Sequence, residues 1–424
     1  MVARWLAGAA AAAVLALAPA PAAHARQPER PSLDGAAAAI LVDARDGTPI
    51  LEKHPREQRS IASTTKLMTA LLTLEQARFD AFYTASDYRA GAAESKIDLR
   101  PGERMRVRDL FEALMLESAN DAAAALAEGV SGSRSAFVAE MNERAAQLGL
   151  KNTSYANPIG LDDPLNYSSA RDLSALAREL LRDRRFARVV DSPSATLTSG
   201  ARPRTVVNRN DLIATVPAVD GVKTGHTTDA GYVLVGSATS SNGARVVSVV
   251  LGEPSEAARD SDTLALLRYG LAQYRRVPVL REGRPVERAD VAYRDETIPL
   301  VPARSVAVTA RRDERIAKRI DAPDELHGEI AAGTRVGTVV LSRDGKVVRR
   351  VPLLAGEEVP GAGPLRRIAS ALGISLTALV LLVIVSIVAI AGIQIRRRRR
   401  ARSQEARRRA RARARDEREH AGQP

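Results

Sequence analysis

Residues 60–70 read SIASTTKLMTA, a stretch that places a serine three positions before a lysine. It predicts the start of a helix, and because residues at i and i+3 share a helical face, the Lys66 side chain can reach the Ser63 hydroxyl. Lysine is rare in this chain, which has seven lysines and 56 arginines. Since lysine can lose its proton and arginine cannot, we interpret the pair as a candidate nucleophile and its base. A helix cap without chemistry is the alternative for so short a motif.

A second motif, ESAND, occupies residues 117–121. It places Ser118 and Asn120 two positions apart, so that a hydroxyl is available to relay a proton and an amide to hold a substrate. A lone serine at such a place is more often a surface cap than a functional residue, so this motif has weight only together with the others.

A third motif is VDGVKTGHTT at 219–228, which contains Lys223, Thr224 and Gly225. A second cation lowers the pKa of a neighbouring lysine, and we expect Lys223 to act on Lys66 in this way. Gly225 would let a substrate backbone pass close to the strand. Each motif alone could arise by chance, but the three in this order are a strong signal.

The pattern of apolar residues around the motifs predicts helices packed on an antiparallel sheet, an α+β domain at 36–276. Two strand pairs turn at Asp46-Gly47 and Asn242-Gly243. From 277 to 355 the chain reads as short alternating strands, which predicts a small β domain. The predicted elements are strands at 36–53 and 231–252, and helices at 64–77, 107–130 with a break near Ser118, 135–150, 169–183 and 262–275.

The N-terminus carries a secretory signal. Arg4 precedes an apolar segment at 5–18 and an A-x-A pattern at 23–25. These features predict a signal peptide at 1–25, followed by a linker at 26–35.

The C-terminal part carries a membrane signal. After a linker at 356–367, residues 368–395 contain no charge and exceed the ~20 residues that cross a bilayer, which predicts a transmembrane helix. The tail at 396–424 has thirteen arginines and a net charge of +9, of a total of +13. The basic tail should stay in the cytoplasm, which places the catalytic domain outside a membrane that the chain crosses once. Its charge then serves orientation and attraction to anionic lipid rather than nucleic-acid binding.

The chain contains no cysteine, which excludes disulfides, thiolate catalysis and cysteine-based metal sites. Its five histidines are scattered, with no H-x-x-x-H pair. We therefore expect neither a metal nor a cofactor.

SIASTTKLMTA, LESAND and DGVKTGHT resemble the three active-site motifs of the penicillin-recognising serine D,D-peptidases. The chain is most similar to the D-alanyl-D-alanine carboxypeptidases among the low-molecular-mass penicillin-binding proteins. The resemblance covers residues 36–275, whereas 277–355 resembles the family's β-rich stalk only in its general pattern of short alternating strands. It implies a serine β-lactamase/D,D-peptidase-like domain, followed by a small all-β domain and one transmembrane helix.

The resemblance also implies roles for the motif residues. Ser63 would be the acylated nucleophile and Lys66 its base. Ser118 would take part in proton transfer, and Asn120 would place the substrate.

For the third motif, the resemblance implies that Lys223, Thr224 and Gly225 dock the substrate strand. The backbone N–H groups of the nucleophile and of His226 would form the oxyanion hole. Arg259 lies where the family often has an arginine for the substrate carboxylate, and a solvated arginine at a helix start is an equal alternative.

The chain departs from the family in two places. Asn166 stands where many relatives have a histidine, so no role is expected there. Many relatives also end in an amphipathic helix that lies on the membrane, whereas residues 368–395 are long enough to span it.

The resulting hypothesis is a serine D,D-carboxypeptidase that removes the terminal D-alanine from peptidoglycan stem pentapeptides and is inhibited by β-lactams. An endopeptidase that cuts cross-links would use the same site. A β-lactamase is disfavoured, because no E-x-x-L-N segment follows Ser118. A non-catalytic penicillin-binding sensor is disfavoured because the tail contains no output domain.

Overall fold

The computed structural model describes residues 29–85 and 87–420, so the predicted signal peptide lies outside the described residues. The chain forms two compact units, which divide between Arg275 and Arg276. The first contains all three motifs.

A five-stranded antiparallel sheet forms the centre of the first unit, in the order β2-β1-β11-β10-β9. Both predicted turns carry a glycine with positive φ, Gly47 at +78° and Gly243 at +81°. The third motif lies in β9, which is at the edge of this sheet. The strands are β1 (Ala38–Asp43), β2 (Pro49–Lys53), β9 (Val219–Thr227), β10 (Gly231–Thr239) and β11 (Arg245–Glu253).

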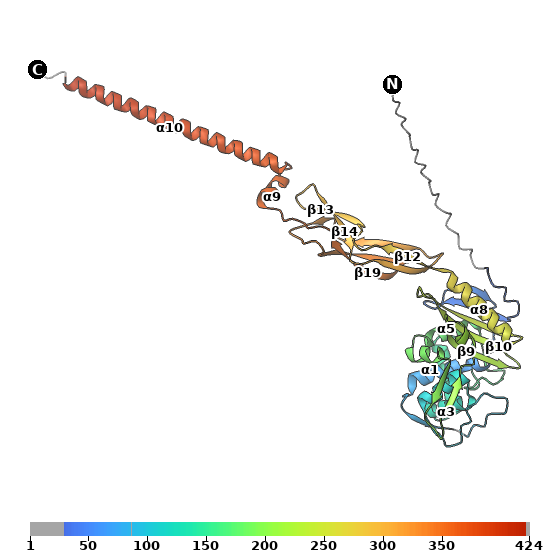
Figure 1. Cartoon of the computed structure of the whole chain (residues 1–424). Coiled ribbons are helices and arrows are strands. Elements are labelled where there is room, and N and C mark those ends of the chain that lie inside the picture. Colours follow the sequence, from blue (N-terminus) through green and yellow to red (C-terminus); the bar gives the residue numbers. More distant parts are fainter. Residues whose placement is uncertain (1–28, 86, 421–424) are drawn as a thin grey trace, which may run out of the picture. The chain divides into compact units, whose positions relative to one another are not determined.

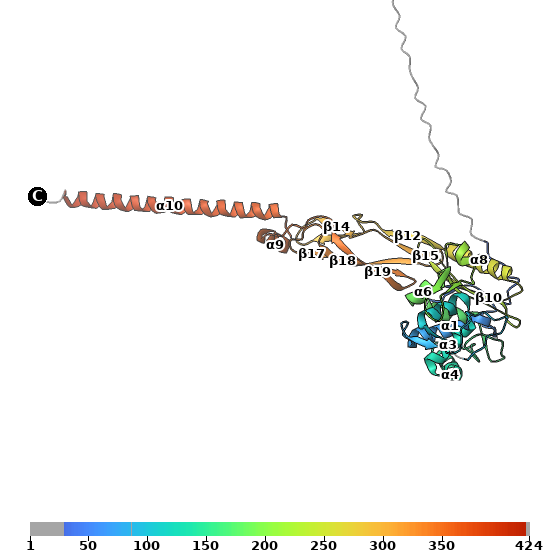
Figure 2. The ribbon, with the colours of Figure 1, turned by 60° about the horizontal axis from the view of Figure 1, so that its bottom comes forward.

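Alternate residues of the strands enter two separate cores, because successive side chains point to opposite faces. Ile40 and Val42 pack against the helices of the first two motifs, whereas Ala39 and Leu41 pack against α8 (Glu256–Ala272). Helices therefore cover both faces of the sheet, as Figures 1 and 2 show. The helices of the larger core are α1 (Lys66–Gln76), α2 (Val107–Glu112), α3 (Asn120–Ser131), α4 (Arg134–Gln147), α5 (Ala170–Leu180) and α6 (Arg184–Val190).

The helix predicted at 107–130 is broken near Ser118, as expected. A wider turn, η2 (Ala113–Glu117), follows α2, and Ser118 then takes a left-handed conformation with φ of 62°. The predicted helix at 262–275 was placed too late, because Ser255 caps α8 by accepting from the Ala258 N–H at 3.2 Å.

Short elements were not predicted, because two to four residues show too little periodicity. They are the turn helix α7 (Leu212–Thr215) and three strand pairs, β3 (Arg59–Ser60) with β6 (Tyr167–Ser168), β4 (Phe82–Thr84) with β5 (Arg104–Arg106), and β7 (Ser194–Leu197) with β8 (Arg204–Val207).

The second unit contains the expected small β domain. Its six-stranded sheet has the order β16-β18-β19-β14-β13-β17, and β12 pairs with β15. Leucine and valine side chains of these strands form one apolar core. The strands are β12 (Tyr274–Leu280), β13 (Glu287–Val291), β14 (Thr297–Pro302), β15 (Val306–Arg311), β16 (Ile316–Asp321), β17 (Glu325–Leu326), β18 (Arg335–Arg343) and β19 (Lys346–Ala355).

The uncharged stretch 368–395 is divided between two helices, which corrects the expected start of the transmembrane helix at 368 to Leu376. Its first residues belong to α9 (Pro364–Ala371), and α10 (Leu376–His420) begins after a turn in which Gly373 has φ of +67°. Within the described part of the chain, α10 is long and apolar enough to cross a membrane. Its uncharged part, 376–395, is ~30 Å long at 1.5 Å per residue, which matches the thickness of a bilayer core.

Candidate active site

The first motif forms a tight turn against the edge strand. Ser63 lies in η1 (Ala62–Thr65), the short 3₁₀ helix that runs into α1, and η1 contacts β9. Ser63 is partly exposed while both flanking residues are buried. The turn therefore presents the serine hydroxyl at the surface of a packed core.

Two glycines allow this turn to approach its neighbours. A Cβ on Gly225 of β9 would lie 2.9 Å from the Ser63 backbone nitrogen. A Cβ on Gly160 would lie 2.0 Å from the Ala62 carbonyl oxygen, and Gly160 also has φ of +97°. Gly225 was expected to make room for substrate; the structure adds that it makes room for the turn that carries Ser63.

Lys66 is fully buried at the start of α1 and contacts the candidate nucleophile. Its ammonium donates to Ser63 Oγ at 3.0 Å, to Asn120 Oδ1 at 2.6 Å and to the Ile159 carbonyl oxygen at 2.6 Å. Burial first, and then the charge of Lys223, lower the pKa of Lys66 well below its usual value, while Glu94 and Asp121 oppose them. The geometry thus places an amine that loses its proton readily beside a serine hydroxyl.

The second motif also contacts Lys66, through Asn120. Asn120 begins α3, and its carbonyl oxygen is the Lys66 acceptor. Ser118 is 5% exposed, and within the described residues no partner lies within hydrogen-bond distance of its Oγ. Its left-handed backbone follows from the break between η2 and α3.

Lys223 is also buried, at 1% exposure on β9, and its ammonium donates to the Thr224 carbonyl oxygen at 3.0 Å. Burial, followed by the charges of Arg209 and Arg259, lowers the pKa of Lys223 to about 7, while Glu117 opposes this shift. The third motif therefore contributes a second lysine that is close to losing its charge at neutral pH.

The two remaining predicted residues differ in exposure. His226 is exposed, and its ring stacks on that of Tyr232 with centroids 4.1 Å apart. Arg259 is 2% exposed, with its guanidinium 2.8 Å from Glu256 and 2.8 Å from Asp260. The alternative of a solvated arginine is therefore wrong, because burial and two carboxylates hold this side chain against α8.

Asn166, for which no role was expected, lies behind the nucleophile turn. Its amide donates to Thr65 Oγ1 at 3.1 Å and accepts from the Ala156 N–H at 3.3 Å. It links the 156–161 segment to the first motif.

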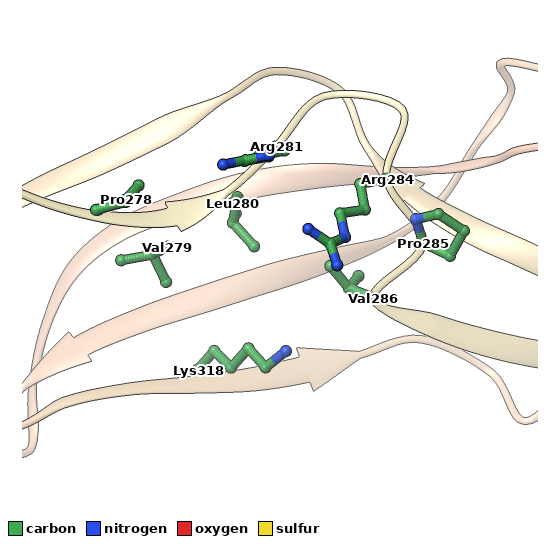
Figure 3. A pocket seen from close by; sticks show the side chains of 8 residues that line it. All are labelled: Pro278, Val279, Leu280, Arg281, Arg284, Pro285, Val286 and Lys318. Atoms are coloured by element: carbon green, nitrogen blue, oxygen red, sulfur yellow. The ribbon is translucent and has the colours of Figure 1, made fainter. Parts of the chain in front are cut away.

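A cavity of about 460 Å³ in the second unit contains none of the motif residues. Figure 3 shows its three cationic side chains, Arg281, Arg284 and Lys318, beside an apolar wall that includes Leu280.

Comparison with known proteins identifies the family of this chain. The family described as D-alanyl-D-alanine carboxypeptidase matches residues 24–255, more than half of the chain. The chain belongs to the D-alanyl-D-alanine carboxypeptidase family. Membership of this family makes the chain a serine-type hydrolase. A second family, described as the C-terminal domain of penicillin-binding protein 5, matches residues 274–361.

Several members of the D-alanyl-D-alanine carboxypeptidase family are similar over most of the chain. DacF of Bacillus subtilis is 32% identical over 348 residues, which is 80% of this chain and 89% of that protein. DacA of Escherichia coli K12 is 32% identical over 351 residues, 78% of this chain and 85% of that protein.

Solved structures of penicillin-binding and DD-peptidase proteins are also similar to this chain in fold. Penicillin-binding protein 5 of Haemophilus influenzae has a TM-score of 0.55 at 31% identity and matches 77% of this chain and 98% of its own. The Streptomyces K15 DD-transpeptidase has a TM-score of 0.53 at 34% identity and matches 56% of this chain and 97% of its own. The expected fold class is confirmed for both units.

Two residues around the three motifs, Glu94 and Arg209, were missed by sequence reasoning. Glu94 contacts Asn120, while Arg209 forms an ion pair with Glu117 of the second motif and lies near Lys223. Neither lies in a recognisable motif. Only the tertiary structure brings them to the site.

Proposed function

We propose that this chain is a D,D-carboxypeptidase that removes the terminal D-alanine of peptidoglycan stem peptides through an acyl-enzyme on Ser63. The observation that carries the proposal is the buried Lys66 amine, 3.0 Å from the Ser63 hydroxyl. The relatives named D-alanyl-D-alanine carboxypeptidase support the substrate class.

In the acylation step, neutral Lys66 accepts the Ser63 proton as Oγ attacks the carbonyl carbon of the scissile peptide bond. The bond to the leaving D-alanine breaks, and its nitrogen takes up a proton. The Ser118 hydroxyl, buried and without a partner among the described residues, is suited to relay that proton. Water then hydrolyses the ester and restores Ser63.

The substrate backbone would add to the sheet at β9. An edge strand offers main-chain donors and acceptors to an extended peptide. The Ser63 backbone nitrogen lies beside Gly225 of that strand, which supports a pair of N–H donors from Ser63 and His226 for the developing oxyanion.

Lys223 would couple substrate binding to activation of the base. A substrate carboxylate beside Lys223 favours the charged form of this lysine, whose pKa is about 7 in the free protein. The added positive charge lowers the pKa of Lys66 further, because Lys223 is the second-largest cause of that shift. Arg259 and Arg209 would strengthen the same positive field.

We also propose that α10 anchors the protein in the cell membrane, with the first unit and the β domain of the second outside. The basic run that begins at Arg396 directly follows the uncharged part of α10. Positively charged segments of this kind remain in the cytoplasm.

Mass spectrometry after treatment with penicillin tests the nucleophile. The adduct is expected on the peptide that contains Ser63 and is expected to be lost in Ser63→Ala. An adduct that persists in Ser63→Ala would place the nucleophile elsewhere and overturn the mechanism.

The choice of substrate needs a separate assay. Release of D-alanine from a monomeric pentapeptide should exceed cleavage of a cross-linked peptide dimer. Faster cleavage of the dimer would make the protein an endopeptidase with the same acyl-enzyme.

A further inference from the structure

Glu94 lies outside the three motifs, in the segment between β4 and β5, yet its carboxylate is hydrogen-bonded to the site. Oε2 accepts from the Asn120 side-chain amide at 2.6 Å and from the Tyr88 hydroxyl, and Oε1 accepts from the Gly91 N–H at 2.8 Å. Burial acts to raise the pKa of Glu94, but the bonds from Tyr88 and Asn120 outweigh it and lower the pKa. Glu94 is therefore an anion at neutral pH.

The position of Glu94 decides which way the Asn120 amide points. An amide has a donating and an accepting end, and a carboxylate only accepts. Because Glu94 takes the NH₂ end, the carbonyl oxygen of Asn120 is directed at the Lys66 ammonium, 2.6 Å away. The opposite orientation would place the Asn120 oxygen against a carboxylate and its NH₂ group against an ammonium.

The segment that carries Glu94 is itself attached to the start of α3. The Asp121 carboxylate accepts from the N–H groups of Ile97 at 3.2 Å and Leu99 at 2.9 Å, and the Asn120 N–H donates to the Ser95 carbonyl oxygen at 2.8 Å. Glu94 is thus held beside Asn120 by bonds that the residues directly after it make to the start of α3.

We propose that Glu94 is a positioning residue that fixes the orientation of Asn120 and, through it, holds the Lys66 amine beside Ser63. This inference rests on the proposed function, since it assigns Glu94 a part in preparing the base. Glu94 touches neither substrate nor the reacting atoms and acts only through Asn120 and its charge.

The charge of Glu94 has an effect separate from its hydrogen bonds. The charged groups that act on Lys66 are Lys223 of β9, Asp121 of α3 and Glu94. Since Glu94, like Asp121, raises the pKa of Lys66 against burial and Lys223, its removal should lower that pKa. In a plot of acylation rate against pH, the rise on the acidic side (the acid limb), which follows deprotonation of Lys66, should then move to lower pH.

The experiment compares Glu94→Gln, Glu94→Ala and Tyr88→Phe in the full-length protein by the second-order rate of acylation with penicillin across pH. Loss of a partly buried, charge-assisted hydrogen bond should reduce the maximal rate of Glu94→Ala by ~10-fold or more. Glu94→Gln keeps one acceptor for Asn120 and should lose less. Both should shift the acid limb to lower pH, whereas Tyr88→Phe keeps the charge and should leave the limb in place.

Asp98→Asn is the matched control, because it removes an exposed carboxylate from the same segment that pairs only loosely with Lys96, at 3.8 Å. It should change neither rate nor profile. If the Glu94 variants lose rate without a shift of the acid limb, their role is merely structural and the proposal fails. It also fails if Glu94→Ala acylates like the wild type. Should Glu94→Ala not fold, the rate and profile of Glu94→Gln decide. An adduct on Ser63 together with release of D-alanine in the wild type shows separately that the proposed function holds.

Discussion

At the scale of single residues, the site depends on two buried lysines in different surroundings. Lys66 has three acceptors around it, one of them Ser63 Oγ, whereas Lys223 donates to a backbone carbonyl on its own strand. Burial is the largest cause of both lowered pKa values. We expect Lys66 to act by losing a proton and Lys223 to act by holding one when substrate arrives.

Substitution by arginine should separate these roles. Lys66→Arg cannot deprotonate, so the rate of acylation by penicillin should fall by the ~10²–10⁴ that a positioned base contributes. Lys223→Arg keeps a positive charge and should lose less. The measurement is the second-order acylation rate of each variant, with circular dichroism to confirm the fold. A folded Lys66→Arg variant that acylates at the wild-type rate would show that Lys66 is not the base.

At the scale of elements, η1, the turn that carries Ser63, is held in place by neighbouring backbone that packs closely against it rather than by its own few hydrogen bonds. Gly160 and Gly225 contact it from two segments that are distant in sequence. A four-residue 3₁₀ helix has poor hydrogen-bond geometry of its own, so its conformation depends on these neighbours.

Gly160→Ala should therefore impair acylation strongly. Its new Cβ would meet the Ala62 carbonyl oxygen at 2.0 Å, which forces the turn that carries Ser63 to move. Gly132→Ala is the control, since Gly132 has a similar φ of +78° but nothing within 4 Å of the added Cβ. Both variants should lose ~1 kcal/mol of stability from the positive φ. Equal acylation rates in the two would argue against packing at η1 as the cause.

The end of β11 provides a test of stability against pH. Glu253 is 1% exposed, and burial followed by the neighbouring Asp262 carboxyl raises its pKa to about 7 from 4.5. A raised folded-state pKa in an acid means that the native state is favoured at low pH and loses stability as pH rises from about 4.5 to about 7. Glu253→Gln, which stays neutral, should remove ~1–3 kcal/mol of this loss at pH 8.

Melting temperatures at pH 5 and pH 8 measure the effect. The gain from Glu253→Gln should appear at pH 8 and be small at pH 5, while the exposed Glu143→Gln control should show no such difference. A gain of the same size at both pH values would mean that ionisation of Glu253 is not its source.

At the scale of the whole molecule, catalysis and attachment belong to different units. Every residue of the candidate site lies before Arg275, and the β domain and α10 lie after it. All three motifs contribute side chains to the larger core of the first unit, and that core contains no residue of the second unit.

Truncation tests this separation. A protein that ends at Arg276 should fold and be acylated by penicillin at the full-length rate, but it should no longer sediment with membranes. Retention of β12 up to this point keeps Tyr274, which is buried in the smaller core. A folded truncated protein with a much lower acylation rate would show that the second unit contributes to the site.

Orientation can be tested because the chain contains no cysteine. Ala332→Cys, at an exposed position of the β domain, should react with an impermeant thiol reagent on intact cells, and Ser403→Cys in the basic part of α10 should not. The opposite labelling would place the β domain inside and remove the enzyme from peptidoglycan.

The sequence by itself determined the family, the fold class and the three motifs, because these depend on local spacing. Ser63 and Lys66 are three residues apart, and the hairpin at Asn242-Gly243 follows from turn chemistry. Only the tertiary structure decided what surrounds them. Glu94 and Asn120 are distant in sequence and come together through folding of a segment without regular periodicity. Burial, side-chain orientation and lowered pKa values depend on the neighbours that pack around a residue. They therefore cannot be predicted from any single stretch of sequence.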